Sequence, residues 1–215
     1  MAKRTAREQM VIRNRRMLIY TFLLILVLLY AAAKQETGSA QEGFVLDESD
    51  MWCLILTNDR YPASGDDQAE RNLQEIPGSS QQVDERVREP LMEMLEDMKD
   101  QGLKPVVCSG YRTLDEQELK ESGSVEHSLG LAVDIGSGSC GQLEEAFADT
   151  PEGVWLGKHS WEYGFILRYD RGKEEYTGIQ YQPWHFRYVG EKAAEYLHRT
   201  GMCLEEFYIE ESLYG

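Results

Sequence analysis

The chain has 215 residues, of which 42% are hydrophobic and 28% charged, and its formal net charge is −16. This length is enough for one domain with a substantial core and a further segment at the N-terminus. A chain this acidic is poorly suited to binding nucleic acid or anionic lipid headgroups, which excludes function classes that depend on a basic surface.

The N-terminal part is predicted to be a membrane anchor. Residues 17–33 (MLIYTFLLILVLLYAAA) are uncharged and almost entirely apolar, at the short end of the range that a membrane-spanning helix needs. Residues 1–16 contain six basic residues and one acidic residue. The positive-inside rule therefore predicts a cytoplasmic N-terminus and a domain outside the cytoplasm. A cleaved secretory signal is the alternative, and it gives the same exported location.

A flexible linker is predicted between the anchor and the folded domain. Residues 34–50 are rich in Gly, Ser, Gln and Glu and lack periodicity. The domain is then expected to span residues 51–215. Beyond residue 16 the chain has 16 basic and 37 acidic residues, which gives the exported part a net charge near −21.

The domain is predicted to mix helices and strands. Apolar residues at spacings of three and four predict an amphipathic helix over 83–101, ended by Gly102. Short apolar runs predict strands at 51–57, 105–109, 129–135, 165–169 and 185–189. Further helices are predicted at 115–120, 142–148, 152–163, 191–199 and 204–211, and residues 61–80 are predicted to be loop. Because this order lacks a regular βαβ rhythm, the predicted class is α+β, with a small, mostly antiparallel sheet flanked by helices and preceded by one transmembrane helix.

The cysteines Cys53, Cys108, Cys140 and Cys203 are far apart and form no C-x-x-C pair, which argues against a cysteine zinc cluster. An exported domain permits disulfides, and four cysteines allow three pairings. Because Cys53 and Cys108 lie inside apolar runs, partly buried free thiols are the favoured interpretation.

Two imidazoles and one carboxylate are candidate zinc ligands. His127 and Asp134 belong to the segment VEHSLGLAVD, and His185 ends the segment QPWH. A set of three such ligands leaves the fourth tetrahedral position open for water, which is typical of catalytic zinc sites. The other histidines, His159 and His198, lie in predicted helices and are interpreted as solvent-facing.

Four segments in order resemble the VanY-type D-alanyl-D-alanine carboxypeptidases: SGYR at 109–112, EHSLGLAVD at 126–134, YGFILRY at 163–169 and PWHFRYVG at 183–190. The resemblance covers residues 52–208, including the pattern Val83-Asp84-x-Arg86. It implies a zinc peptidase of the hedgehog/DD-peptidase fold that acts on bacterial peptidoglycan stem peptides. It also implies that His127, Asp134 and His185 hold the zinc ion.

The resemblance further implies roles for residues around the metal. Arg112 would neutralise the oxyanion formed at the peptide carbonyl, and a surface ion pair is its alternative. Gln117 and Ser128 would contact the substrate. Tyr111 and Trp184 would line the site, although aromatic residues there also suit core packing.

The most consequential departure from the family is Gln182. The family has a glutamate here, which takes a proton from water and passes it to the leaving amine, and an amide cannot do this at neutral pH. Glu126 and Glu162 are the other carboxylates considered as bases, but neither matches a family position for that role. Gln182 is explained either by an introduced substitution or by a natural chain that has become a binding protein.

Two smaller departures concern the substrate cleft. Val125 stands where the family usually has a small hydroxyl residue, which Ser124 would partly replace, and the stretch between Gln117 and Glu126 is short. The leading interpretation is a membrane-anchored zinc D,D-carboxypeptidase that removes terminal D-alanine from stem peptides, with turnover impaired by Gln182. The alternatives are an L,D-carboxypeptidase acting on tetrapeptide stems and an inert protein that binds stem peptides. A zinc-free structural or signalling domain is disfavoured because all three ligands are present.

Overall fold

The computed structural model describes residues 48–58, 61, 71–113, 125–141 and 143–214. The chain divides into two compact units, Met1–Val45 and Leu46–Gly215. The first unit lies outside the described residues, and with it the predicted cytoplasmic segment, the predicted spanning segment and most of the predicted linker. Within the described ranges no helix is both long and apolar enough to cross a bilayer.

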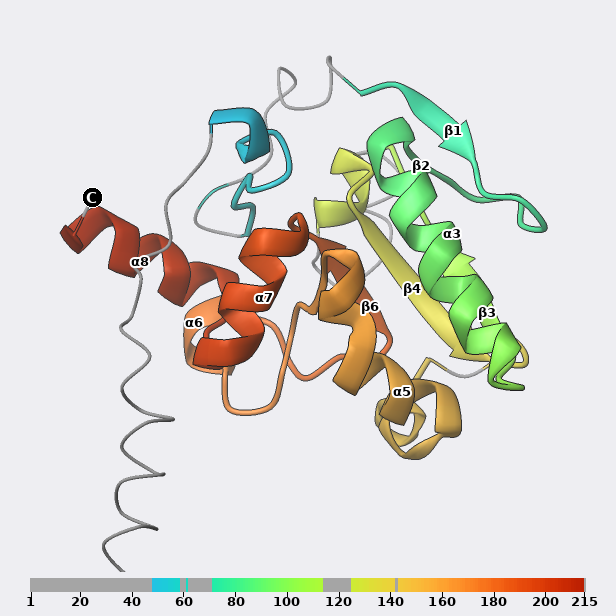
Figure 1. The fold of residues 1–215 in the computed structure, drawn as a ribbon. Helices are drawn as coiled ribbons and strands as arrows, with labels where there is room; N and C mark the ends of the chain where they lie inside the picture. Colours follow the sequence, from blue (N-terminus) through green and yellow to red (C-terminus); the bar gives the residue numbers. More distant parts are fainter. Residues whose placement is uncertain (1–47, 59–60, 62–70, 114–124, 142, 215) are drawn as a thin grey trace, which may run out of the picture. The chain divides into compact units, whose positions relative to one another are not determined.

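The second unit is built around a four-stranded antiparallel sheet with the strand order β3-β4-β6-β5 (Figure 1). The strands are β3 (Pro105–Ser109), β4 (Ala132–Ser137), β5 (Phe165–Leu167) and β6 (His185–Tyr188). A separate antiparallel ribbon is formed by β1 (Leu73–Glu75) and β2 (Gln82–Asp84). This arrangement confirms the α+β class with a small antiparallel sheet.

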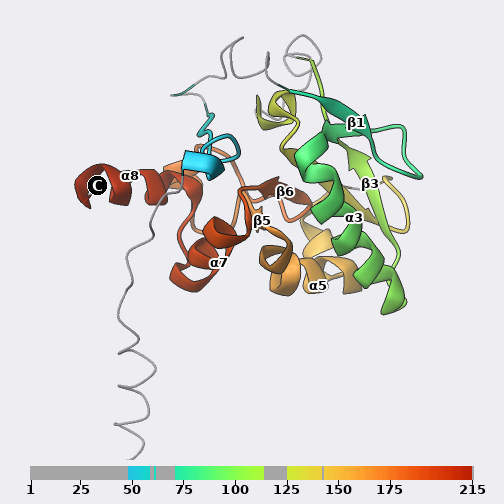
Figure 2. The same cartoon turned by 45° about the horizontal axis from the view of Figure 1, so that its top comes forward.

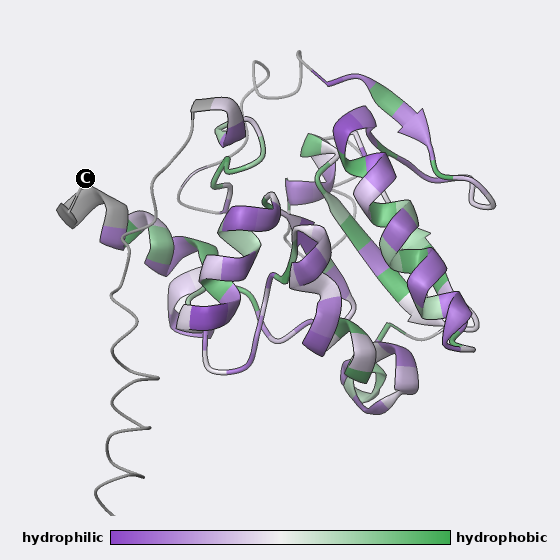
Figure 3. Ribbon diagram, in the orientation of Figure 1, coloured by the Kyte–Doolittle hydropathy of each residue, from purple (hydrophilic) through white to green (hydrophobic). Residues whose placement is uncertain are grey.

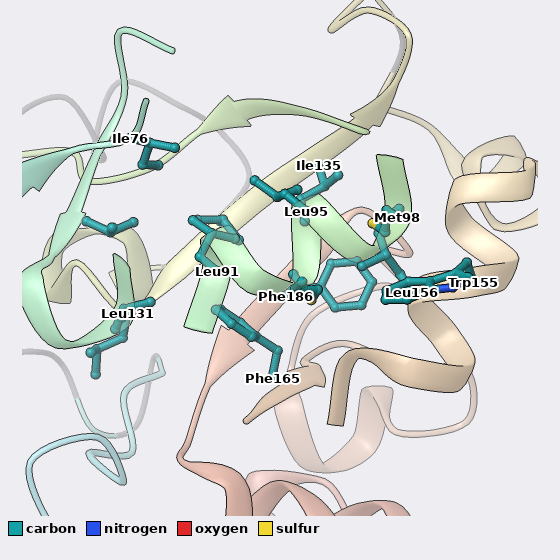
Figure 4. Close-up of a cluster of buried hydrophobic side chains, with 14 of the residues drawn as sticks. Ile76, Leu91, Leu95, Met98, Leu131, Ile135, Trp155, Leu156, Phe165 and Phe186 are labelled. Atoms are coloured by element: carbon teal, nitrogen blue, oxygen red, sulfur yellow. The ribbon is translucent and has the colours of Figure 1, made fainter. Parts of the chain in front are cut away.

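Helix α3 (Glu85–Asp100) supplies much of the core. Its buried residues recur at spacings of three and four, as the sequence predicts: Val87, Leu91, Met94, Leu95 and Met98. Figure 4 shows side chains of this stripe beside Ile135 of β4 and Phe186 of β6, and Figure 3 shows hydrophilic and hydrophobic residues alternating along the helix. Fully burying one such side chain contributes roughly 1.5–3 kcal/mol. The helix ends before Gly102, whose φ is 81°.

The other α-helices come after β4 in the chain. They are α5 (Pro151–His159), α6 (Glu174–Thr177), α7 (Glu191–Thr200) and α8 (Leu204–Tyr214). A 3₁₀ helix, Ser160–Tyr163, continues α5 up to Gly164. Figure 2 shows α7 and α8 grouped at one end of this unit and α3 with β1 at the other. The predicted helices at 152–163, 191–199 and 204–211 are thus confirmed, whereas α6 was not predicted.

The predicted strand at 51–57 is wrong, because this segment forms a turn followed by irregular backbone. Its carbonyl groups bind a side chain instead of a neighbouring strand. Arg187 Nη2 donates to the carbonyl oxygens of Cys53 at 3.1 Å and Ile55 at 2.8 Å. A segment can therefore be apolar and buried without joining the sheet, provided that its polar backbone groups are satisfied in another way.

Three other predicted elements need correction. The predicted loop at 61–80 contains β1. The strand predicted at 129–135 begins only at Ala132, because a 3₁₀ helix covers Val125–Leu129 and Gly130 adopts a left-handed φ of 67°. The helix predicted at 142–148 is a 3₁₀ helix, Glu145–Asp149, whereas the one predicted at 115–120 lies outside the described residues.

The interpretation that the cysteines are free thiols is confirmed for Cys53 and Cys203 and is wrong for Cys108 and Cys140. Cys108 of β3 and Cys140, in the segment that follows β4, form a disulfide with a Cα–Cα distance of 5.2 Å. Their sequence separation is 32 residues, and closing a loop of this size stabilises a fold by about 3–4 kcal/mol in the chain-entropy model. Cys53 and Cys203 are free and buried as predicted, and burial raises the pKa of Cys53 to about 11.

Asp84 joins the β1–β2 ribbon to α3 and is fully buried. Its carboxylate caps the helix by accepting from the Arg86 backbone N–H at 3.0 Å, and it also accepts from the Arg86 side chain and from Arg71 Nη1. Burial alone would raise the pKa of Asp84, but the bonds and charges of Arg86 and Arg71 outweigh it, so that the pKa is lowered.

Asp84→Ala is expected to reduce the free energy of unfolding by about 2–4 kcal/mol, since it removes a helix cap and one partner of a buried ion pair. Because the folded-state pKa is lowered, this contribution is fully present above the ordinary pKa of an aspartate and is lost as the pH falls through the folded value. Denaturant titrations at neutral and acidic pH measure both effects. Glu89→Ala, an exposed change in the same helix, is the control and should stay within about 0.5 kcal/mol of the wild type. Equal stability of Asp84→Ala and Glu89→Ala would contradict the prediction.

Candidate metal centre

The three predicted ligands come together on the central strands of the sheet. Asp134 of β4 is the register partner of His185 in β6, so their side chains are direct cross-strand neighbours. His127 lies in the 3₁₀ helix that immediately precedes β4. Asp134 Oδ2 is 3.2 Å from His127 Nε2, and Asp134 Oδ1 is 2.9 Å from His185 Nδ1. All three residues are buried, and their potential ligand atoms lie within 4.8 Å of one another.

Burial and neighbouring groups shift the pKa values of the three cluster residues in different directions. Burial alone would raise the pKa of Asp134, but the neighbouring imidazoles of His127 and His185 hold it well below its usual range. Burial lowers the pKa of His127. Burial also acts to lower the pKa of His185, but its hydrogen bonds with Asp134 and Glu126 outweigh this effect and raise the pKa.

The backbone around Gly110 orients His127. Its Nδ1 is 2.7 Å from the carbonyl oxygen of Gly110, and because a carbonyl only accepts, Nδ1 carries the proton and Nε2 faces Asp134. A side chain at Gly110 would clash with the carbonyl of Gln82. Gly110 can therefore lie this close to Gln82 only because it has no side chain. Its carbonyl group fixes the tautomer of His127.

Glu126 occupies the other side of His185, and the sequence did not indicate this role. Its Oε2 is 3.4 Å from His185 Nε2. Arg168 and Arg187 bind its other oxygen, and burial, which would raise the pKa of Glu126, is outweighed by these two charges, which hold it well below the usual range. The available signal was a pair of arginines within the apolar runs at 165–169 and 185–189, since such residues are rarely buried unless they are paired.

Arg112 lies at the metal cluster, as the resemblance implies. Its Nη2 is 2.9 Å from Asp134 Oδ2, its Nε donates to Ser109 Oγ at 2.7 Å, and its backbone N–H donates to the carbonyl of His127. The side chain is only 12% exposed, which disfavours the alternative of a surface ion pair. These contacts hold the guanidinium beside the position that a metal would occupy.

Gln182 lies in the turn that leads into His185. The backbone N–H of His185 donates to the Gln182 carbonyl at 3.1 Å, and Gln182 N–H donates to the carbonyl of Tyr169 at 3.0 Å. Trp184, in the same turn, packs partly buried against the hydrophobic core. This contact favours the core-packing alternative for Trp184.

The other predicted substrate contacts have different placements. Ser128 is fully buried and donates its hydroxyl to the carbonyl of Val125 at 2.7 Å, a placement that does not favour a substrate contact. Tyr111 is half-buried, and its backbone N–H donates to the carbonyl of Gln82. Gln117 and Ser124 lie outside the described residues.

The two alternative bases, Glu126 and Glu162, are both bound to other side chains. Glu126 is fully buried behind His185 and is bound by Arg168 and Arg187. Glu162, an exposed residue of the 3₁₀ helix after α5, is paired with His159, the last residue of α5. His198 is also exposed, and its ring stacks on Trp161, so His159 and His198 lie outside the metal cluster, as predicted.

The donor set fits one zinc ion. Two imidazoles and a carboxylate are common zinc ligands, and at bond lengths of about 2 Å neighbouring tetrahedral ligand atoms lie roughly 3.3 Å apart. The two imidazole–carboxylate separations, 3.2 Å to Asp134 Oδ2 and 2.9 Å to Oδ1, are close to this value, and one ligand atom from each of the three residues lies within 4.8 Å of the others. Each imidazole also has an acceptor for its second ring nitrogen, which is typical of metal-binding histidines.

Comparison with known proteins identifies relatives of this chain. The family model described as VanY, D-alanyl-D-alanine carboxypeptidase, matches residues 119–191. The D-alanyl-D-alanine carboxypeptidase of Enterococcus faecalis is 31% identical over 205 residues, which cover 82% of this chain and 69% of the relative. The putative carboxypeptidase YodJ of Bacillus subtilis is 39% identical over 137 residues, which cover 55% of this chain. The chain spans half the length of YodJ.

Solved structures agree with these matches. VanYB in complex with D-alanine-D-alanine has a TM-score of 0.64 at 31% identity and covers 73% of this chain and 97% of its own. A mutant of the D,D-pentapeptidase VanY in complex with Zn(II) has a TM-score of 0.61 at 31% identity, covering 73% and 99%. The LD-carboxypeptidase LdcB has a TM-score of 0.55 at 36% identity, covering 59% and 68%. With its cluster of zinc ligands and these relatives, the chain belongs to the VanY family of D-alanyl-D-alanine carboxypeptidases.

Proposed function

We propose that the chain is a zinc-dependent D,D-carboxypeptidase of the bacterial cell envelope, acting on peptidoglycan stem peptides that end in D-alanine, and that its turnover is slow. The observation that carries the proposal is the buried cluster of His127, Asp134 and His185. The D-alanine-D-alanine bound by VanYB and the peptidoglycan recognised by LdcB support the substrate class.

The residues of the site have different roles in peptide hydrolysis. Zinc, when bound, polarises a carbonyl and lowers the pKa of water. Arg112, held by Ser109 and Asp134, presents a fixed positive charge to the oxyanion that develops at the peptide carbonyl. Gln182 is placed one turn before His185 but cannot take up or donate the proton that the reaction must move. Substrate binding is therefore retained better than turnover.

Two other functions share this site. An L,D-carboxypeptidase would use the same ligands, and the similarity to LdcB supports it. An inert stem-peptide-binding protein would keep the metal and Arg112 while losing hydrolysis, and Gln182 supports it. Release of D-alanine from pentapeptide stems, from tetrapeptide stems or from neither distinguishes the three functions.

The test is incubation of the zinc-loaded chain with purified muropeptides, followed by mass spectrometry. Slow loss of one D-alanine from pentapeptide stems is the expected result. Loss from tetrapeptide stems alone would identify an L,D-carboxypeptidase. Saturable binding of pentapeptide stems without product would favour the inert binding protein.

We also propose that the domain is held outside the cytoplasm by the apolar segment 17–33. The Cys108–Cys140 disulfide supports this location, because disulfides persist in oxidising compartments. Protease added to intact protoplasts is expected to degrade the domain and to leave a short N-terminal fragment, whereas a cleaved signal would leave none. Protection of the domain in intact but not in lysed protoplasts would reverse this topology.

A further inference from the structure

Behind the metal cluster lies a buried network of charged side chains. Arg168 and Arg187 are the two largest fully buried side chains among the described residues. Both bind Glu126 Oε1, through Arg168 Nε at 2.6 Å and Arg187 Nη1 at 2.8 Å. Arg168 also makes two bonds to Glu205 of α8, at 2.8 and 2.6 Å. The network therefore joins the residue after β5, strand β6 and helix α8 to the residue that precedes His127.

The two oxygens of Glu126 have different partners. Oε1 accepts from both arginines, whereas Oε2 lies 3.4 Å from Nε2 of His185. A carboxylate only accepts hydrogen bonds, so a proton on Nε2 is the arrangement that this contact favours. The ring then presents its other nitrogen, Nδ1, to Asp134 at 2.9 Å.

We propose that Glu126 is a positioning residue for the zinc ion, which holds His185 in the tautomer that binds metal through Nδ1. Gly110 does the corresponding work for His127, whose Nδ1 is held and whose Nε2 faces Asp134. The two histidines thus present opposite ring nitrogens to one ion. The bonds from the two arginines to Oε1 leave Oε2 of Glu126 pointing at His185.

A role of Glu126 in stability alone would predict different effects of substitution from a role in positioning His185. Arg187 also binds the carbonyls of Cys53 and Ile55, so removing any carboxylate from this network is expected to cost stability. Glu205 offers a matched control, because it binds Arg168 through Nη1 and Nη2, whereas Glu126 binds Nε of the same guanidinium, and Glu205 also accepts from Asn58. A structural role predicts that Glu126 and Glu205 behave alike.

Glu126→Gln changes the chemistry at His185 with almost no change in size. The amide has one oxygen, and the two guanidinium groups require an acceptor, so the amide nitrogen turns towards His185. An N–H donor facing Nε2 favours the ring with its proton on Nδ1, which is the wrong tautomer for the metal. Glu205→Gln leaves the contact between Glu126 and His185 intact.

The experiment measures zinc affinity by competition with a chelator, using the folded full-length chain and both variants. Glu126→Gln is expected to weaken zinc binding by about 10–100-fold, the usual effect of losing such a partner, whereas Glu205→Gln leaves it unchanged. With cobalt in place of zinc, the absorption spectrum is expected to change only in Glu126→Gln. Equal zinc affinities and equal cobalt spectra in the two variants would overturn the proposal.

A second measurement needs no variant and therefore does not depend on whether Glu126→Gln folds. In the zinc-loaded wild-type chain with ¹⁵N-labelled histidine, nuclear magnetic resonance is expected to show His185 protonated on Nε2 and His127 protonated on Nδ1. A His185 ring protonated on Nδ1 would refute the role of Glu126. The proposal rests on the zinc site and not on turnover, so a hydrolytically inactive chain with this tautomer pattern would contradict the proposed function alone.

Discussion

Replacing Gln182 by glutamate is expected to raise the rate of D-alanine release from a pentapeptide stem by about 10²–10⁴-fold, the usual contribution of a general acid–base group. Glutamate would serve both as the base towards water and as the acid towards the leaving amine, so the gain should lie at the upper end of this range. Because glutamine and glutamate are nearly equal in size, the increase is expected mainly in kcat, with little change in substrate binding.

The measurement compares D-alanine release by the two forms at equal zinc content. Gln180→Glu makes the same chemical change at an exposed position two residues earlier, and it should leave the rate unchanged. Recovery is expected to remain partial, since Val125 supplies no hydroxyl group. Brisk turnover by the unmodified chain would mean that another group is the base, and no gain on Gln182→Glu would favour the inert binding protein.

The second large effect is expected on metal content. The wild-type chain should bind about one equivalent of zinc, and His185→Ala should reduce this to a small fraction, because it removes one of three protein ligands. His198→Ala removes an exposed histidine that stacks on Trp161 and should retain the full equivalent. Metal analysis of the purified chains checks both results. Unchanged zinc content in His185→Ala would show that the ligand assignment is wrong.

The parts of the fold that could be predicted from sequence are those specified by local pattern. The stripe of α3 and the glycine that follows it are encoded within about twenty residues, and the strand at 105–109 has the predicted bounds. The strand predicted at 51–57 failed because an apolar run does not reveal whether its backbone pairs with a strand or with a side chain such as Arg187.

The ligands of the candidate site could be named from motifs, but their surroundings could not. Contact between Asp134 and His185 depends on the register of β4 against β6, which a single strand does not specify. Glu126 meets Arg168 across 42 residues of sequence, and Cys108 meets Cys140 across 32. Such pairings are properties of the folded topology, and so they become visible only when the strands are placed.

The bonds from Arg187 to the carbonyls of Cys53 and Ile55 also limit how far the chain can be shortened from its N-terminal side and still fold. The family match begins at residue 119, and a fragment cut there would lack both carbonyls, Cys108 and Arg112. Arg187, two residues along β6 from His185, would then be left with fewer acceptors in the interior, and a buried charge with too few partners is costly. The shortest piece able to fold and hold zinc therefore starts before Cys53, well upstream of the segment by which the family is recognised.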